Sequence, residues 1–178
     1  MTELRGPRVL LRDWSLADLA PFAALNADPE VMRHFPAPLT SAASDALAGR
    51  IVRHIRREGF GLWALEAPGL PFAGFVGLAR VPFAARFTPA VEIGWRLGRA
   101  AWGRGYAAEA ARLALAHGFG ALGLREVVSF TVPANERSWR LMGRLGMRPD
   151  GGFEHPGLPD GHPLRPHLLY RLGAPPPA

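Results

Sequence analysis

Residues 91–110 read VEIGWRLGRAAWGRGYAAEA, and two structural signals meet in this stretch. Its first part alternates apolar residues with Glu92, Gly94 and Arg96. This alternation predicts a strand over residues 90–97 with one buried face. Its last part places a run of small residues after two closely spaced glycines, which predicts a helix that ends near residue 122. The stretch therefore predicts a strand, a glycine-containing loop and a helix in direct succession.

The loop WGRGYA at residues 102–107 has two interpretations, an ordinary tight turn or an anion-binding loop. Gly103 and Gly105 permit positive φ and a close backbone approach. The amides and dipole at a helix N-terminus favour a phosphate, Arg104 adds charge, and Ala107 and Ala108 keep bulk away. The loop matches neither a P-loop nor a dinucleotide fingerprint. We favour the anion-binding loop.

The elements on either side of this stretch predict the fold class. We expect strands over residues 8–13, 61–66, 72–81, 125–132, 147–153 and 167–172, and helices over 15–23, 28–35, 40–57 and 135–145. Helices thus interrupt a mostly β chain without strict alternation, which predicts an α+β domain with a central mixed sheet covered on both faces. We expect one domain over residues 1–172 and a disordered Pro-rich tail over residues 173–178.

Composition narrows the function. The net charge of +6 suits an anionic ligand, but the arginines are scattered along the chain, which argues against a nucleic-acid partner. The chain has no cysteine, no signal-like N-terminus and no membrane-spanning apolar run, so we expect a cytoplasmic location and no membrane. His155, His162 and His167 lie near one another, but no HExxH pattern accompanies them, so we expect no metal and place them at a cleft or in loop hydrogen bonds.

Residues 91–110, together with VPANERSWRLMGRLGM at residues 132–147, resemble the acyl-CoA-binding core of the GNAT superfamily of N-acetyltransferases. The similarity is greatest to the RimJ/RimL-like branch, which acetylates ribosomal-protein N-termini. Residues 11–36 and 153–172 also resemble bacterial members. In the family pattern Q/R-x-x-G-x-G/A, Trp102 takes the first position, Gly105 the central one and Ala107 the last. Trp102 departs from the general pattern, as is common in this branch.

The resemblance implies a splayed, mixed, mostly antiparallel sheet and acetyl-CoA as cosubstrate. It also allows a homodimer, which is common in this branch. The pyrophosphate would bind the backbone amides of the loop, and the pantetheine would pair with the preceding strand and contact an asparagine. The implied cofactor-binding residues are Ile93, Gly94, Trp95, Gly103, Arg104, Gly105, Tyr106, Ala107, Ala108, Asn135 and Ser138.

The implied reaction is direct attack of a neutral amine on a thioester. An α-amino group is about 10–20% neutral at pH 7, whereas a lysine is neutral about 0.04% of the time, a difference of roughly 3.5 kcal/mol. Glu92 is the candidate base, acting through water; its alternatives are a plain strand residue or an arginine partner. Ser138 is the candidate acid, since Met142 stands where many family members have a tyrosine. From the residues alone, Asn135 is a helix N-cap with Ser138 at N3.

The acceptor side is less defined by sequence. Met32, His34, Phe35 and His155 are candidates for the acceptor pocket, with a core role as the alternative for the apolar ones. The acceptor that the resemblance favours is a protein or peptide α-amino group. The alternatives are a small amine such as an aminoglycoside, polyamine or amino acid, or a non-catalytic module that binds RNA, ribosomes or CoA.

Overall fold

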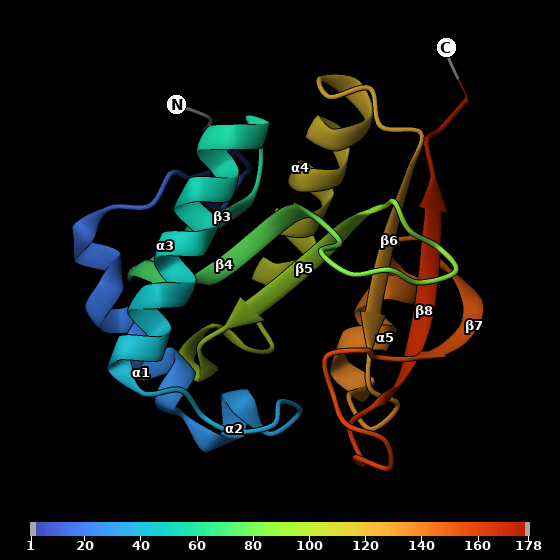
Figure 1. The fold of residues 1–178 in the computed structure, drawn as a ribbon. Coiled ribbons are helices and arrows are strands. Elements are labelled where there is room, and N and C mark those ends of the chain that lie inside the picture. The colour runs from blue at the N-terminus through green and yellow to red at the C-terminus, as the bar shows by residue number, and fades with distance from the viewer. Residues whose placement is uncertain (1–2, 177–178) are drawn as a thin grey trace.

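A computed structural model describes residues 3–176, and within these residues eight strands form one sheet in the order β1-β2-β3-β4-β5-β6-β8-β7 (Figure 1). The strands are β1 Leu4–Arg5, β2 Leu10–Arg12, β3 Leu62–Ala67, β4 Leu70–Arg80, β5 Val91–Leu97, β6 Glu126–Thr131, β7 Arg148–Glu154 and β8 Pro166–Gly173. The helices are η1 Leu16–Asp18, α1 Leu19–Ala27, α2 Pro29–Met32, α3 Ser41–Glu58, η2 Arg99–Ala101, α4 Tyr106–Gly120 and α5 Glu136–Arg144.

The pairing of the strands confirms a mixed, mostly antiparallel sheet. All neighbouring strands run antiparallel except β5 and β6, which are parallel. The β5–β6 pairing is confined to Glu92 opposite Val128, so these two strands diverge beyond this point. The sheet is therefore open in its middle, as the family resemblance implied.

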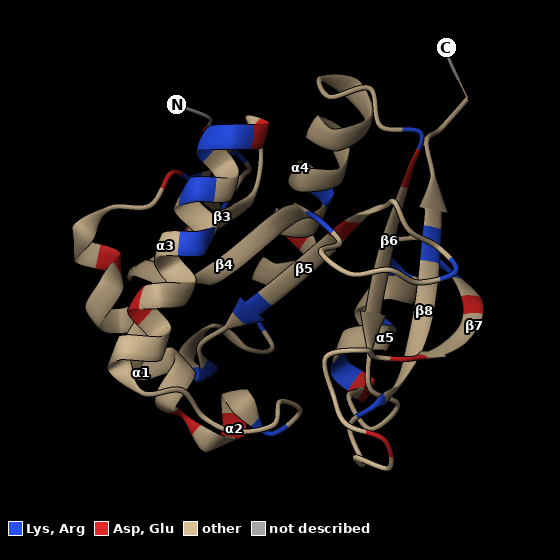
Figure 2. Ribbon diagram, viewed as in Figure 1, with Lys and Arg blue, Asp and Glu red and all other residues tan. Residues whose placement is uncertain are grey.

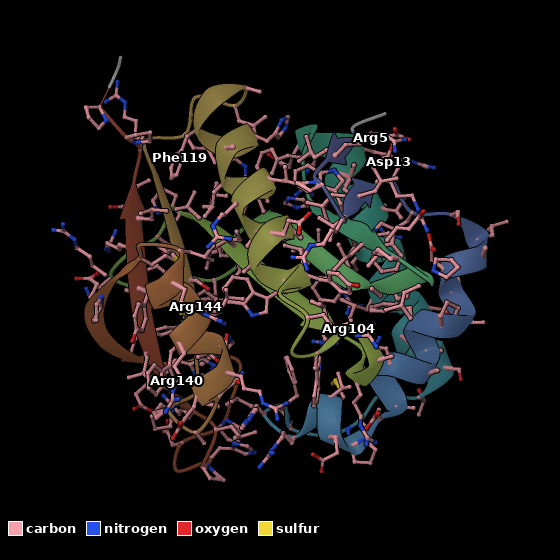
Figure 3. All side chains as sticks on the ribbon, turned by 180° about the vertical axis from the view of Figure 1, so that it is seen from behind. Arg5, Asp13, Arg104, Phe119, Arg140 and Arg144 are labelled. Atoms are coloured by element: carbon pink, nitrogen blue, oxygen red, sulfur yellow. The ribbon has the colours of Figure 1, made fainter. Side chains whose placement is uncertain are left out.

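Helices cover both faces of the sheet. Figures 1 and 3 show α1 and α3 on one face and α4 and α5 on the other. The α3 helix buries Ser44, Ala48 and Ile51, which lie on one face at helical spacing. The helix expected at residues 40–57 is therefore amphipathic. The α4 helix lies close to the sheet because it presents small side chains; a Cβ on Gly118 would lie 2.8 Å from Leu78 Cδ1. The predicted α+β class is thus confirmed.

A buried ion pair fixes the start of the chain. Asp18 is 2% exposed and accepts two hydrogen bonds from the Arg12 guanidinium, at 2.8 and 2.9 Å. Its carboxylate also accepts from the backbone N–H of Ser15 at 2.7 Å. Residues 15–18 (SLAD) therefore form a single capped 3₁₀ turn, η1, and α1 follows it directly. This arrangement joins β2 to the helical layer.

Two local expectations need correction, and one strand was not predicted. The short strand β1 was not predicted, because two residues give no periodicity. The strand expected at residues 72–81 is β4 at Leu70–Arg80. The turn before it takes only residues 68–69, so the last two residues of the PGLP sequence at 68–71 already belong to the strand. Strand β8 extends to Gly173, and the N–H of Ala174 donates to Arg125 O at 2.8 Å, so the expected tail begins later. Residues 177–178 of that tail lie outside the described residues.

Charged side chains are interspersed over the elements. Figure 2 shows basic and acidic residues on several helices and strands, with basic residues prominent along α3. None of the helices formed by residues 3–176 combines the length and apolar content that crossing a membrane requires.

Candidate acetyl-CoA and acceptor site

The loop before α4 presents a row of free amides. Gly103 and Gly105 have φ of +72° and +80°, which L side chains rarely adopt, and Gly105 is the N-cap of α4. Within residues 3–176, the N–H groups of residues 103–108 form no hydrogen bond, whereas the N–H of Glu109 bonds to Gly105 O at 3.1 Å. A short exposed loop with unpaired donors at a helix N-terminus is suited to an anion.

Two contacts from distant elements hold this loop in place. Arg8, which precedes β2, donates through Nε to Glu109 at 2.8 Å and through Nη1 to Arg104 O at 3.0 Å. On the other side, Trp102 donates to Leu97 O at 2.8 Å, and the Arg137 guanidinium of α5 lies 4.7 Å from the Trp102 ring. Figure 3 shows Arg104 at this loop, on the same side of the sheet as α5. Sequence analysis did not identify Arg8 or Arg137, since their partners are distant in the chain.

The cavity begins where β5 and β6 separate. Beyond the Glu92–Val128 pair, residues 93–96 of one strand and 129–132 of the other border an open cavity of about 450 Å³. Ser129 bridges the strands at its narrow end, donating to Ile93 O at 2.9 Å. Since the neighbouring strand is absent on this side, the edge of β5 is available for pairing with an extended chain. The predicted residues Ile93, Gly94 and Trp95 all border the cavity.

Glu92 lies at this narrow end, on the floor of the cavity. Within residues 3–176 its carboxylate makes neither a hydrogen bond nor an ion pair, so it is not an arginine partner. Burial raises the pKa of Glu92 to about 7. A carboxyl group with this pKa exchanges protons readily at neutral pH.

The start of α5 borders the opposite wall. Asn135 is the N-cap residue of α5 and Ser138 is at N3, as predicted, but the Asn135 side chain makes no capping hydrogen bond; its Nδ2 donates to Thr131 Oγ1 at 3.0 Å. Ser138 borders the cavity, and its hydroxyl has no hydrogen-bond partner within the described residues. Met142 is fully buried and carries no proton donor. Ser138 is thus an available hydroxyl on this wall.

Two histidines form a pair on the cavity wall. His155 and His167 both border the cavity, with ring centroids 5.0 Å apart. Nδ1 of His155 accepts from the N–H of Gly157 at 3.1 Å, and Nδ1 of His167 lies 3.0 Å from Arg165 O. Burial, chiefly, lowers the pKa of both rings, so they are neutral at pH 7. The third histidine of the cluster, His162, does not border the cavity.

The other predicted acceptor residues separate into two groups. His34 and Phe35 follow α2 and border the cavity. Met32 is 3% exposed and does not line the cavity. The structure therefore places Met32 in the core, which was the alternative to a role in the acceptor pocket. Arg96 borders the cavity and was not predicted, although it lies on the same face of β5 as Glu92 and Gly94. That shared face was the signal available in the sequence.

This geometry defines a class. A parallel strand pair that opens in the middle of an antiparallel sheet, next to a glycine loop with free amides at a helix N-terminus, is the architecture of a CoA-dependent acyltransferase. A family model described as an acetyltransferase (GNAT) domain matches residues 8–148. The chain belongs to the GNAT acetyltransferase family.

Similar proteins agree with this assignment. The Bacillus subtilis protein YkkB is 30% identical over 148 residues, covering 82% of this chain and 85% of its own. An FsC-acetyl coenzyme A-N(2)-transacetylase of Aspergillus fumigatus is 34% identical over 130 residues, covering 69% of this chain and 55% of its own. The structure of Mycobacterium smegmatis RimJ, in complex with CoA-disulfide, aligns with a TM-score of 0.75 at 23% identity, covering 97% of this chain and 86% of its own.

The family membership sets the activity. The chain is an acetyl-CoA-dependent N-acetyltransferase that acts on an amine. The free amides of residues 103–108 fit the requirement of this cosubstrate for an anion-binding loop. Within residues 3–176, no group of three or more His, Cys, Asp or Glu side chains is arranged to hold a metal ion.

Proposed function

We propose that the acceptor is the α-amino group of a protein or peptide, and that Glu92 accepts its proton, directly or through water. The observation that carries this proposal is the basicity and placement of Glu92: an unpaired carboxyl group with a pKa of about 7 at the narrow end of the cavity. Moving a proton from an α-ammonium of pKa about 7.8 to such a group costs about 1 kcal/mol. From a lysine ammonium it costs about 4–5 kcal/mol.

We assign the cosubstrate to the other side of the opening. The pyrophosphate binds the amides of residues 103–108, with Arg104 as a rim charge. The pantetheine follows the free edge of β5 at Ile93, Gly94 and Trp95, within reach of Asn135. This orientation brings the thioester to the point where the two strands separate. The support is the continuity of the free amides, the free strand edge and the cavity.

The reaction then follows from the groups at that point. The amine nitrogen forms a bond to the carbonyl carbon of the acetyl thioester, and the carbon–sulfur bond breaks. One ammonium proton goes to Glu92 before the attack. After the carbon–nitrogen bond forms, the nitrogen loses a second proton, and the departing thiolate gains one through the Ser138 hydroxyl. Since Met142 replaces the usual acid, much of the rate enhancement comes from positioning the two substrates.

A small amine is the second candidate acceptor. The name of the Aspergillus relative describes acetyl transfer to a nitrogen of FsC, which is not described as a protein. His155 and His167 on the cavity wall are suited to such a compact acceptor, since neutral imidazoles donate and accept hydrogen bonds.

The experiment uses three kinds of acceptor. After the acetyl-CoA affinity is measured by calorimetry, thiol release is followed with peptides that have a free N-terminus and no lysine, with N-terminally blocked peptides that contain one lysine, and with aminoglycosides and polyamines. We expect turnover of the free N-termini and none of the blocked peptides. Turnover of the lysine peptides or of the small amines alone would overturn the acceptor assignment, and failure to bind acetyl-CoA would overturn the cosubstrate site.

A further inference from the structure

Arg96 is a buried cation on the acceptor side of the sheet. Its guanidinium carbon lies 4.2 Å from the ring centroid of Phe35 and 5.4 Å from that of Phe75. Nη1 donates to Asn26 Oδ1 at 2.6 Å. Asn26 is fully buried, and its own Nδ2 donates to Ser44 Oγ at 2.9 Å, which fixes the amide so that its oxygen faces the arginine. The guanidinium is therefore held in one place by three elements.

This cation lacks a counter-ion. Within residues 3–176 Arg96 forms no salt bridge, and its Nε is buried without a hydrogen-bond partner. Burial lowers the pKa of Arg96 to about 10, since no carboxylate compensates for the lost hydration. Other buried or half-buried arginines of the chain, such as Arg12 and Arg171, do have carboxylate partners. An unpaired buried charge is costly and marks a place where a ligand can supply the partner.

The acetyl-CoA phosphates are not suited to this role. Side chains of Val91, Ile93 and Leu97 pack in the same core cluster as the alanines of α4, on one face of β5. Arg96 alternates with these residues and contacts Asn26 of α1, on the opposite face. The sheet thus separates Arg96 from the free amides at the start of α4. The group that Arg96 would bind must enter with the acceptor.

We propose that Arg96 binds an anionic group, a carboxylate or a phosphate, of the acceptor, and so selects amines that carry a negative charge. This proposal rests on the proposed function, because it takes the cavity beside Glu92 as the acceptor site. Two aromatic rings and a fixed amide hold the guanidinium toward the same cavity that Glu92 borders. A charged hydrogen bond formed in such a desolvated site is stronger than one in water.

The strand geometry sets the distance between the amine and the anion. Glu92 and Arg96 are four residues apart on β5, so their α-carbons are separated by about 13 Å. An extended peptide spans this distance in about four residues. Because an acidic side chain itself extends toward Arg96, fewer residues are needed between the amine and the anion. We therefore expect an acidic residue at the second to fourth position of a peptide acceptor. In a small acceptor, the anion and amine must lie at opposite ends.

The test compares matched acceptors with and without the anion. One series uses tetra-alanine amide and its variants with glutamate or phosphoserine at the second, third or fourth position. A second series uses linear amino acids with terminal amine and carboxylate against the corresponding amides. We expect kcat/KM to be about tenfold higher for the best anionic member of a series than for its neutral partner. We expect Arg96→Gln to remove this preference, so that kcat/KM falls about tenfold more for the anionic acceptors than for their neutral partners.

A structural role for Arg96 gives a different pattern. If the arginine only supports Phe35 and Phe75, Arg96→Gln lowers kcat/KM for neutral and anionic acceptors alike and leaves the ratio between them unchanged. If Arg96 binds the anion, Arg96→Gln abolishes the ratio, and Arg96→Lys, which keeps the charge, retains part of it. Arg56→Gln on the exposed surface of α3 controls for the loss of one positive charge. Acetyl-CoA affinity, measured by calorimetry, is expected to stay unchanged in all three variants.

The outcomes separate this proposal from the proposed function. If no peptide reacts but anionic small amines are preferred in an Arg96-dependent way, the peptide assignment fails and the anion site stands. If peptides react without any preference for an acidic residue, the peptide assignment stands and the anion site is overturned. If no member of either series reacts, both are overturned.

Discussion

Replacing Glu92 by glutamine tests the central feature of the site, because one substitution changes stability and activity in opposite directions. The pKa of Glu92 is raised by burial from its ordinary value of 4.5 to about 7 in the folded protein. Between these two pH values the folded state therefore binds more protons than the unfolded state, and stability falls as pH rises. Above pH 7 the folded protein carries an ionised carboxylate without a partner.

The magnitude follows from the size of the shift. A difference of about 2.5 pKa units corresponds to about 3 kcal/mol. Because the carboxylate borders an open cavity, water screens part of this penalty, and we expect about 1–3 kcal/mol. Glutamine cannot ionise, so Glu92→Gln avoids the penalty. The stability advantage of the variant should therefore increase by about 1–2 kcal/mol between pH 5 and pH 8.5.

Urea unfolding of both proteins at several pH values between 5 and 8.5 measures this difference. Other carboxylates whose pKa values are lowered by their arginine partners, such as Asp150, affect both proteins equally and cancel in the comparison. A stability difference that is independent of pH, or that is larger at acidic pH, would refute the view that Glu92 is an unpaired buried carboxyl group.

The same variant reports on catalysis. A base of pKa about 7 must be ionised to accept a proton, so wild-type kcat/KM should fall as pH decreases below 7. In Glu92→Gln we expect kcat to fall by about 10²–10⁴-fold and the acetyl-CoA affinity to stay unchanged. A variant that keeps the wild-type rate and pH profile would show that water or another group is the base.

The remaining predictions address the loop, the acid and the fold. Gly105→Glu should weaken acetyl-CoA binding more than tenfold, or by about 1.4 kcal/mol, in calorimetry; Gly105→Ala measures the strain at φ +80° by itself, and equal affinities for wild type and Gly105→Glu would return the loop to a simple turn. Ser138→Ala should lower kcat about tenfold or more with little change in acetyl-CoA affinity, as measured by thiol release, and an unchanged kcat would remove Ser138 from the proton path. Asp18→Ala should cost about 3–5 kcal/mol in urea unfolding, because it leaves the Arg12 guanidinium without its bidentate partner; a loss below about 1 kcal/mol would contradict this account.

The sequence predicted the parts of the site that depend on neighbouring residues. The positive φ of Gly103 and Gly105 and the free amides before α4 follow from residues within one short loop. The alternation of β5 placed Glu92 on the face opposite Ile93, and the order of elements gave the α+β class. Asn135 is the N-cap of α5, as the local sequence predicted, although its side chain makes no capping hydrogen bond and its Nδ2 donates to the Thr131 hydroxyl.

The tertiary structure decided which side chains have partners. Three features have no signal in the sequence. Among residues 3–176 the Glu92 carboxylate has no hydrogen-bond or ion-pair partner. Arg96 contacts Asn26, 70 residues away, and Arg8 contacts Glu109, 101 residues away. His155 and His167 read as members of a three-histidine cluster, and the fold pairs these two at the cavity and leaves His162 out.

Local sequence thus determined the strand, the loop and the helix that we propose as the acetyl-CoA phosphate site, because backbone conformation and helix ends depend on a few adjacent residues. The acceptor side depended on the packing of α1, α2 and the segment before β8 against β5 and β6. Periodicity states which face of a strand a residue occupies, but burial and charge pairing are set by what packs across from it. That packing raised the pKa of Glu92 and left Arg96 without a counter-ion among residues 3–176.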